Sequence, residues 1–238
     1  MNNREKLISY ALEAKGDYFK IKKFILDNKT PREFEGNVKA ITILDDIYPR
    51  KLYELRYPPF VLFYKGNINL LKEECVGVVG SRQPCEYALN ATSKLCSELD
   101  EVVISGLAKG IDRQAHIYSK KTIGVLGCGI DYIYPFDNKD LFLKLEKEGL
   151  ILSEYPEKVL PINYHFPFRN RIICGLSNKL FVMQSNTNSG TMTSVNEMLE
   201  LGREIEVLPY DIFDENGINN NNLIKEGATL LNLKDLKN

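Results

Sequence analysis

The sequence predicts an α/β fold, an extended Rossmann-like and mostly parallel sheet with helices on both faces, preceded by a short helical N-terminal segment. From residue 75 onward, apolar runs of strand length alternate with amphipathic segments of helix length. Continuous apolar strands separated by amphipathic helices indicate a mostly parallel sheet that is covered on both faces. The composition agrees, because 44% hydrophobic and 26% charged residues are ordinary for a globular protein.

The first part of the chain is predicted to be helical. Apolar residues recur at loosely helical spacing among lysines within residues 7–26. A connection restricted by prolines follows at residues 48–59, and residues 60–64 have the pattern of a strand. We therefore divide the chain into a short helical segment, residues 1–44, and a Rossmann-like domain, residues 45–238.

The remaining elements follow in alternating order. Strands are expected at residues 76–79, 102–104, 123–126, 150–152, 180–183 and 205–208. Helices are expected between them, at residues 87–99, 113–119, 140–148, 169–176 and 192–201. In such a sheet, ligands bind at the carboxyl ends of the strands, where loops lead into helices.

Composition and motifs argue against several classes of protein. No apolar run reaches the roughly 18 residues of a membrane span, and the first residues lack a signal-peptide core, so we expect a cytoplasmic protein without membrane contact. The five cysteines form no C-x-x-C pair and the chain has two histidines, so we expect no metal site. A net charge of −1 means that any affinity for nucleic acid must come from a local basic patch.

Two predicted strand ends have sequences that suit an anion. Gly80-Ser81-Arg82 offers close backbone approach, a hydroxyl donor and a bidentate guanidinium, although a tight turn whose arginine pairs with a surface carboxylate fits equally well. Residues 105–112 contain Gly106 and Lys109 but lack the spacing of a dinucleotide loop. Lys109 is a candidate phosphate partner, and Asp112 is expected to cap the following helix.

Two further strand ends are also rich in glycine. Residues 127–131 form a glycine-containing turn that is weak evidence by itself. Ser189-Gly190-Thr191 opens a helix, so free N–H groups, hydroxyls and the helix dipole could cradle a phosphate. A helix start capped by Ser189 or Thr191 explains this sequence equally well.

The most informative segment contains two aromatic rings beside two arginines. Phe166 and Phe168 precede Arg169, Asn170 and Arg171, and no acidic residue occurs in residues 159–184. Planar guanidinium groups next to aromatic faces suit a phosphate backbone with unpaired bases. Because the two arginines are neighbours at a predicted helix start, they cannot both face the same ligand, and one is expected to be structural.

Catalytic signatures are missing from the sequence. We find no P-loop lysine motif, no G-x-S-x-G elbow and no metal-ligand spacing. His116 is expected to be structural, and His165 has no nucleophile adjacent in sequence. These observations favour binding over catalysis, and we expect no cofactor.

Taken in order, these motifs resemble the DNA-processing protein A family (DprA, also called Smf). The motifs that carry the resemblance are Gly80-Ser81-Arg82, the loop at residues 105–112 with His116, Phe166 through Ile173, and Ser189-Gly190-Thr191. The resemblance covers roughly residues 45–230.

The resemblance implies a non-enzymatic protein that binds incoming single-stranded DNA during natural transformation and helps to load a RecA-type strand-exchange recombinase, usually as a homodimer. In this picture Arg82 and the Gly80-Ser81 backbone hold phosphates, Phe166 stacks on a base, and Arg169 and Arg171 line or brace the pocket. Asn170 could equally lock the loop internally. The implied nucleic-acid-binding residues are Gly80, Ser81, Arg82, Gly106, Lys109, Phe166, Arg169, Asn170, Arg171, Ser189, Gly190 and Thr191.

Two alternatives belong to other functional classes. Lysine-decarboxylase-like phosphoribohydrolases, which act on nucleoside monophosphates, resemble the chain in their Rossmann variant and Gly-Thr cradle. Their pattern has a glutamate three residues beyond the threonine, where this chain has Ser194. A nucleotide-sensing module is a weaker alternative.

Overall fold

The computed structural model describes residues 1–185 and 190–232. Among these residues, nine strands form one sheet in the order β1-β2-β6-β5-β4-β3-β7-β8-β9. The strands are β1 (Ala40–Thr42), β2 (Val61–Gly66), β3 (Cys75–Gly80), β4 (Val102–Ser105), β5 (Thr122–Leu126), β6 (Leu150–Ser153), β7 (Lys179–Gln184), β8 (Glu204–Val207) and β9 (Thr229–Leu230). Strand β2 runs antiparallel to both of its neighbours, and the other pairings are parallel. The predicted fold class is confirmed.

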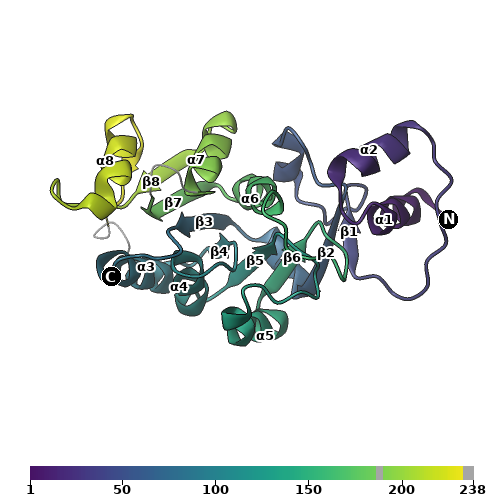
Figure 1. Cartoon of the computed structure of the whole chain (residues 1–238), viewed down its shortest axis with the longest axis horizontal. Coiled ribbons are helices and arrows are strands. Elements are labelled where there is room, and N and C mark those ends of the chain that lie inside the picture. Colours follow the sequence, from purple (N-terminus) through teal and green to yellow (C-terminus); the bar gives the residue numbers. More distant parts are fainter. Residues whose placement is uncertain (186–189, 233–238) are drawn as a thin grey trace.

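Helices cover both faces of the sheet. They are α1 (Asn3–Glu13), α2 (Tyr18–Leu26), α3 (Glu86–Glu98), α4 (Ile111–Tyr118), α5 (Lys139–Glu148), α6 (His165–Leu176), α7 (Gly190–Glu200) and α8 (Ile218–Lys225). Helices α3, α4 and α5 lie on one face, whereas α6, α7 and α8 lie on the other (Figure 1). Helices α1 and α2 lie beside β1, at the end of the sheet opposite α8 (Figure 1).

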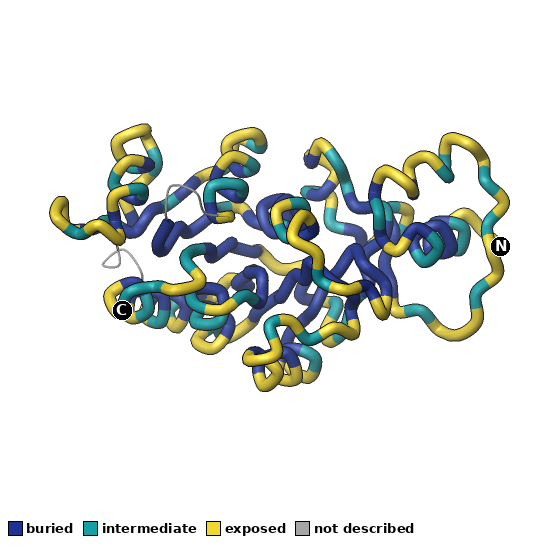
Figure 2. The backbone as a smooth tube through the Cα atoms, viewed as in Figure 1, coloured by how far each residue is buried: buried dark blue, intermediate teal, exposed yellow. Residues whose placement is uncertain are grey.

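The local sequence explains these elements. Strand β5 is buried along its whole length, as expected for an apolar strand between two helical layers. Helix α3 buries Ala88, Ala91, Thr92, Leu95 and Cys96, which recur at the spacing of one helix face. Figure 2 shows the buried backbone concentrated in the sheet between exposed helix surfaces.

Two sequence predictions about helix starts were wrong. Helix α6 begins at His165, four residues before the expected start, because Pro167 is tolerated in a first turn, where its missing N–H needs no partner. Helix α4 is preceded by Gly110 as its N-cap, with a φ of 74°. Asp112 therefore lies inside the first turn, and its carboxylate accepts the N–H groups of Gly106 and Ala108 in the preceding loop.

The N-terminal helices share a core with the sheet. Leu7 and Ile8 of α1 belong to the same buried cluster as Val61 and Phe63 of β2. Strand β1 also pairs with β2 inside the common sheet. The division of the chain at residue 44 stays a prediction.

His116 and most of the cysteines lie in the protein core. His116 is buried, and its Nδ1 atom lies 2.6 Å from the Thr122 hydroxyl, as expected of a structural residue. Four of the five cysteines are buried and Cys85 is partly buried. In the described ranges, no helix combines the length and apolar character needed to cross a membrane, and no group of His, Cys, Asp and Glu has the geometry of a metal site.

Candidate nucleic-acid interface

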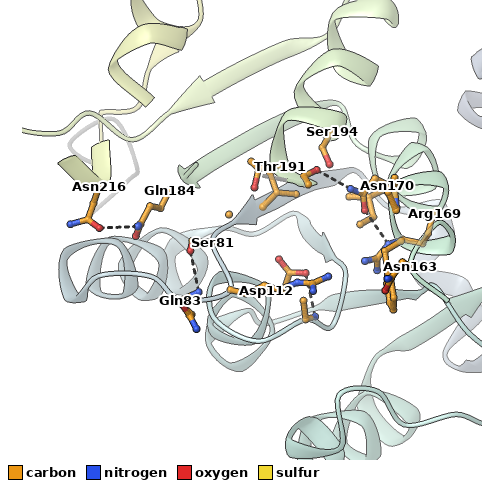
Figure 3. A pocket seen from close by; sticks show the side chains of 18 residues that line it. Ser81, Gln83, Asp112, Asn163, Arg169, Asn170, Gln184, Thr191, Ser194 and Asn216 are labelled. Carbon is orange, nitrogen blue, oxygen red and sulfur yellow. Dashed lines mark hydrogen bonds between the residues drawn. The ribbon is translucent and has the colours of Figure 1, made fainter. Parts of the chain in front are cut away.

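A pocket of about 1050 Å³ lies at the carboxyl edge of the sheet, where the connections after β3 and β7 begin. These adjacent parallel strands lead to helices on opposite faces, an arrangement that opens a crevice at a strand-order switch point. The lining residues are Val79, Gly80, Ser81, Arg82, Gln83, Ala108, Asp112, Asn163, Phe166, Pro167, Arg169, Asn170, Ile173, Gln184, Gly190, Thr191, Ser194 and Asn216. Figure 3 shows that the labelled side chains come from both helical layers.

The loop after β3 presents Arg82 to the pocket. The Ser81 hydroxyl accepts the Gln83 N–H at 3.0 Å, and the Ser81 carbonyl accepts the Ile111 N–H at 3.1 Å. The loop backbone is therefore fixed, whereas the Arg82 side chain is exposed. Within the described residues, no carboxylate forms an ion pair with Arg82. Its guanidinium lies 5.7 Å from the centre of the Phe166 ring.

Phe166 is placed by the first turn of α6. A Cβ atom at Gly127 would lie 2.8 Å from its ring, so glycine at this position permits the close approach of the ring to the β5 end. The Tyr134 ring lies beside the Phe166 ring, with the two centres 5.5 Å apart, and both rings line a small cavity of about 90 Å³. Tyr134 is 42% exposed, and it was not among the residues predicted to form the site.

Lys109 lines the same small cavity beside Phe166. Its ammonium group forms an exposed ion pair with Asp137. Part of its charge is therefore already compensated, whereas Arg82 has no such ion pair within the described residues.

Arg169 supports the pocket from inside. It is only 4% exposed, and Nη1 donates hydrogen bonds to the Gly106 carbonyl at 2.8 Å and to the Val125 carbonyl. Gly106 is needed here because an added Cβ would lie 2.5 Å from the guanidinium. Burial lowers the pKa of Arg169, and the charge of Asp112 opposes this effect. We infer that Arg169 positions the ends of β4 and β5.

Arg171 is buried outside the pocket lining. Its guanidinium pairs bidentately with Glu154, with both N–O distances at 2.6 Å. It also donates hydrogen bonds to the carbonyls of Tyr57 and Phe168, both at 2.9 Å. Arg171 is thus the structural arginine of the pair, although Arg169 is also largely engaged with backbone groups.

The opposite wall comes from α7 and the end of β7. Asn170 donates a hydrogen bond to the Gly190 carbonyl at 3.2 Å, and its Oδ1 accepts one from Arg169, so it links α6 to the start of α7 (Figure 3). Gly190 and Thr191 line the pocket, and Ser189 lies outside the described residues. Ser194 also lines the pocket, and its buried hydroxyl has no hydrogen-bond partner in the described part of the chain.

The pocket lining also contains four amide side chains that were not predicted from the sequence. The Gln184 carbonyl oxygen accepts the Cys85 N–H at 2.8 Å, and its amide nitrogen lies 3.5 Å from the Asn216 oxygen. Gln83 and Asn163 add two further amides to the lining. These residues lie in four separate loops or strand ends, so no local sequence signal could have grouped them.

The chemistry of the lining suits a polyanion with aromatic bases. An exposed guanidinium, a partly exposed phenyl ring and neutral hydrogen-bonding groups face the same space. Among the described residues, Asp112 supplies the carboxylate on this lining. It is buried and accepts hydrogen bonds from backbone N–H groups. His165 lies outside the lining and stacks on Tyr155 with ring centres 3.9 Å apart.

Comparison with known proteins identifies similar chains. Residues 39–237 match the family model described as DNA recombination-mediator protein A. The chain is 39% identical over 211 residues to the DNA processing protein DprA of Streptococcus pneumoniae, covering 86% of this chain and 74% of that protein.

Two solved structures are similar along most of the chain. The X-ray structure of DprA from Streptococcus pneumoniae superposes with a TM-score of 0.79 at 34% identity, covering 95% of this chain and 89% of that one. A structure of DNA processing protein A from Helicobacter pylori, described for its single-stranded DNA binding mode, gives a TM-score of 0.76 at 30% identity. That match covers 85% of this chain and 95% of the other.

Proposed function

The chain belongs to the DNA recombination-mediator protein A family, and from this membership we propose that it binds single-stranded DNA in the pocket at the carboxyl ends of β3 and β7. The observation that carries the proposal is the exposed Arg82 guanidinium, unpaired within the described residues, 5.7 Å from the Phe166 ring. A guanidinium binds backbone phosphate, and a neighbouring ring stacks on a base of any sequence. The family structure described for single-stranded DNA binding supports this assignment.

The site residues have different roles in this proposal. Arg82 and the Gly80-Ser81 backbone contact phosphate, and Phe166 stacks on a base, with Tyr134 beside it. Lys109, Gly190 and Thr191 contribute at the margins. Arg169, Gly106 and Asn170 hold the pocket walls through the hydrogen bonds described above, and Arg171 acts as a brace outside the lining.

Phe166→Ala is expected to weaken binding of a single strand by about 10- to 100-fold, because stacking on an aromatic side chain contributes about 1–3 kcal/mol per base. Fluorescence anisotropy with a labelled oligothymidylate measures this change. Phe166→Tyr keeps the ring and should remain within about threefold of the parent chain. Equal affinities for the parent and Phe166→Ala chains would refute the stacking role.

We also propose that the chain acts by binding, without catalysis. Ser194 stands where the phosphoribohydrolase pattern has its glutamate, and a hydroxyl with no basic partner is a poor substitute for that carboxylate. Incubation with nucleoside monophosphates, followed by chromatography for free base, tests this point. Sustained release of base would overturn the proposal in favour of the hydrolase.

We also propose two protein partners. One is a second copy of the chain, and the other is a RecA-type recombinase that the protein helps to load during transformation or recombination. Large apolar side chains are exposed around α8 and β9, as protein contacts require, including Ile212 at 80% and Phe213 at 87%. Sedimentation equilibrium tests the dimer, and the rate of recombinase assembly on coated single strands tests loading. A monomer at all concentrations would refute the dimer. An assembly rate that does not change when the protein is present would refute recombinase loading.

A further inference from the structure

We propose that a bound DNA strand continues from the pocket across the first turn of α6 to a second stacking site formed by Phe19, Tyr57 and Phe168. We call this site the Phe19 platform, and it lies between α2 and α6. The inference rests on the proposed function, because it extends the same strand beyond the pocket. It adds the N-terminal helices to the DNA-binding surface.

Three aromatic rings from distant parts of the chain meet on this surface. The ring centres of Phe19 and Tyr57 are 5.4 Å apart, and each lies 6.2 Å from that of Phe168. Phe19 is 58% exposed, and the other two rings are partly exposed. Contiguous exposed apolar side chains often mark an interaction site, and every base offers a flat face for such a contact.

The layer beneath the platform holds the rings in place. Tyr18 is buried and stacks on Phe60 with ring centres 4.8 Å apart. The Arg171 guanidinium lies 3.8 Å from the centre of the Phe168 ring and donates hydrogen bonds to the carbonyls of Tyr57 and Phe168. The buried pair of Arg171 with Glu154 thus fixes two of the three platform segments. A fixed surface loses little conformational entropy when a ligand binds.

Cationic side chains lie near two of the platform rings. Lys22 and Lys23 lie one helical turn beyond Phe19 on the same side of α2, and both are exposed. The Arg56 guanidinium lies 5.3 Å from the centre of the Tyr57 ring. None of these three cations forms an ion pair within the described ranges, whereas Lys20 pairs with Asp17 at 3.5 Å. Aromatic faces beside free cations fit a phosphate-bearing strand with unpaired bases.

Helix α6 connects the platform to the pocket. Phe166 faces the pocket and Phe168 faces α2, because residues two apart point to nearly opposite sides of a helix. A helix is about 10–12 Å wide with its side chains, so a few nucleotides suffice to cross it. The crossing is lined by exposed Asn163, Tyr164 and Pro167, and residues 159–184 carry no acidic side chain. Figure 1 shows α6 between α7 and the segment that contains α2.

The proposal predicts a dependence on strand length. Phe19→Ala, and separately the double change Lys22→Gln with Lys23→Gln, should weaken binding of an oligothymidylate of about 20 nucleotides by about tenfold. The affinity for one of about 6 nucleotides should stay unchanged, because this length is near the lower limit of about 4 nucleotides for a single binding fold and can occupy the pocket without the platform. Anisotropy titrations at fixed salt measure both lengths, and thermal unfolding confirms that the variants are folded. The lysine variant removes exposed side chains, so it tests the platform even if Phe19→Ala unfolds.

Matched controls separate the platform from general effects of size and charge. Tyr118→Ala removes a ring that is 46% exposed at the end of α4 away from the pocket. Lys144→Gln with Lys147→Gln removes two exposed charges from α5, on the other face of the sheet. Both controls should bind the longer strand as the parent chain does. Losses as large as those of the platform variants would refute a local site.

The outcomes distinguish the platform from the pocket. If Arg82→Ala weakens binding of both lengths while the platform variants bind the longer strand normally, the pocket stands and the platform is wrong. If the parent chain binds neither length, the proposed function fails and the platform fails with it. A loss confined to the longer strand supports both.

Discussion

Arg82→Ala is expected to weaken binding of single-stranded DNA by about 10- to 100-fold at moderate salt. A hydrogen bond to a charged group contributes about 1.5–3 kcal/mol, and a guanidinium can form two with one phosphate. The variant also removes the cation beside the Phe166 ring. The change should be similar for all sequences, because a phosphate contact reads no base. Anisotropy titration at several salt concentrations measures both the affinity and its salt dependence.

Two matched variants make the Arg82 result specific. Arg50→Ala removes another exposed arginine, next to Lys51, which pairs with Glu74 just before β3 begins. That site lies at the amino-terminal edge of the sheet, away from the pocket, and its loss should change affinity by less than about twofold. Arg82→Lys keeps the charge without the planar guanidinium group. Its loss of DNA affinity should lie between the losses of Arg50→Ala and Arg82→Ala. Equal losses for Arg50→Ala and Arg82→Ala would show that the contact is not local.

Glu154→Gln is expected to destabilise the protein by about 3–5 kcal/mol. The change leaves the Arg171 guanidinium buried without a counter-charge, and removing one partner of a buried ion pair has this cost. The two side chains are 5% and 4% exposed, so solvent screens them little. The pair joins the end of β6 to α6 and to the segment containing Tyr57. Urea unfolding followed by circular dichroism measures the loss.

A surface pair provides the comparison for Glu154. Lys120 and Asp100 are 2.8 Å apart and largely exposed, so Asp100→Asn should leave the urea midpoint almost unchanged. Similar midpoints for Glu154→Gln and Asp100→Asn would contradict the bracing role of Arg171. The residual DNA affinity of folded Glu154→Gln protein should fall mainly for longer strands, since the pair supports the Phe19 platform.

The sheet was predictable because most of its strands are continuous apolar runs. Residues 123–126 illustrate this, since every residue of β5 is buried and no polar alternation blurs the pattern. Strands β1 and β9 were not predicted because three and two residues give too short a pattern. The early start of α6 was missed because a proline two residues after His165 usually suggests a break.

The candidate site was predictable in part. The sequence order of the strand-end loops brought Arg82, Phe166 and Gly190 to one edge, and the structure places these residues around one pocket. The partners of the arginines were not predictable, because they are carbonyl groups and a carboxylate supplied by distant strands. Arg169 bonds to Gly106 and Val125, and Arg171 to Glu154. Sequence motifs identify candidate residues, but they do not determine which rotamer a long arginine side chain adopts or which groups it contacts.

The most direct test of the account compares single-stranded with duplex DNA of the same length over a range of salt concentrations. We expect tighter binding of the single strand, because Phe166 can stack only on an unpaired base. The logarithm of the association constant should fall linearly with the logarithm of salt concentration, with a slope of about −0.7 per phosphate contacted. Duplex binding as tight as single-strand binding, or binding that does not respond to salt, would contradict the account.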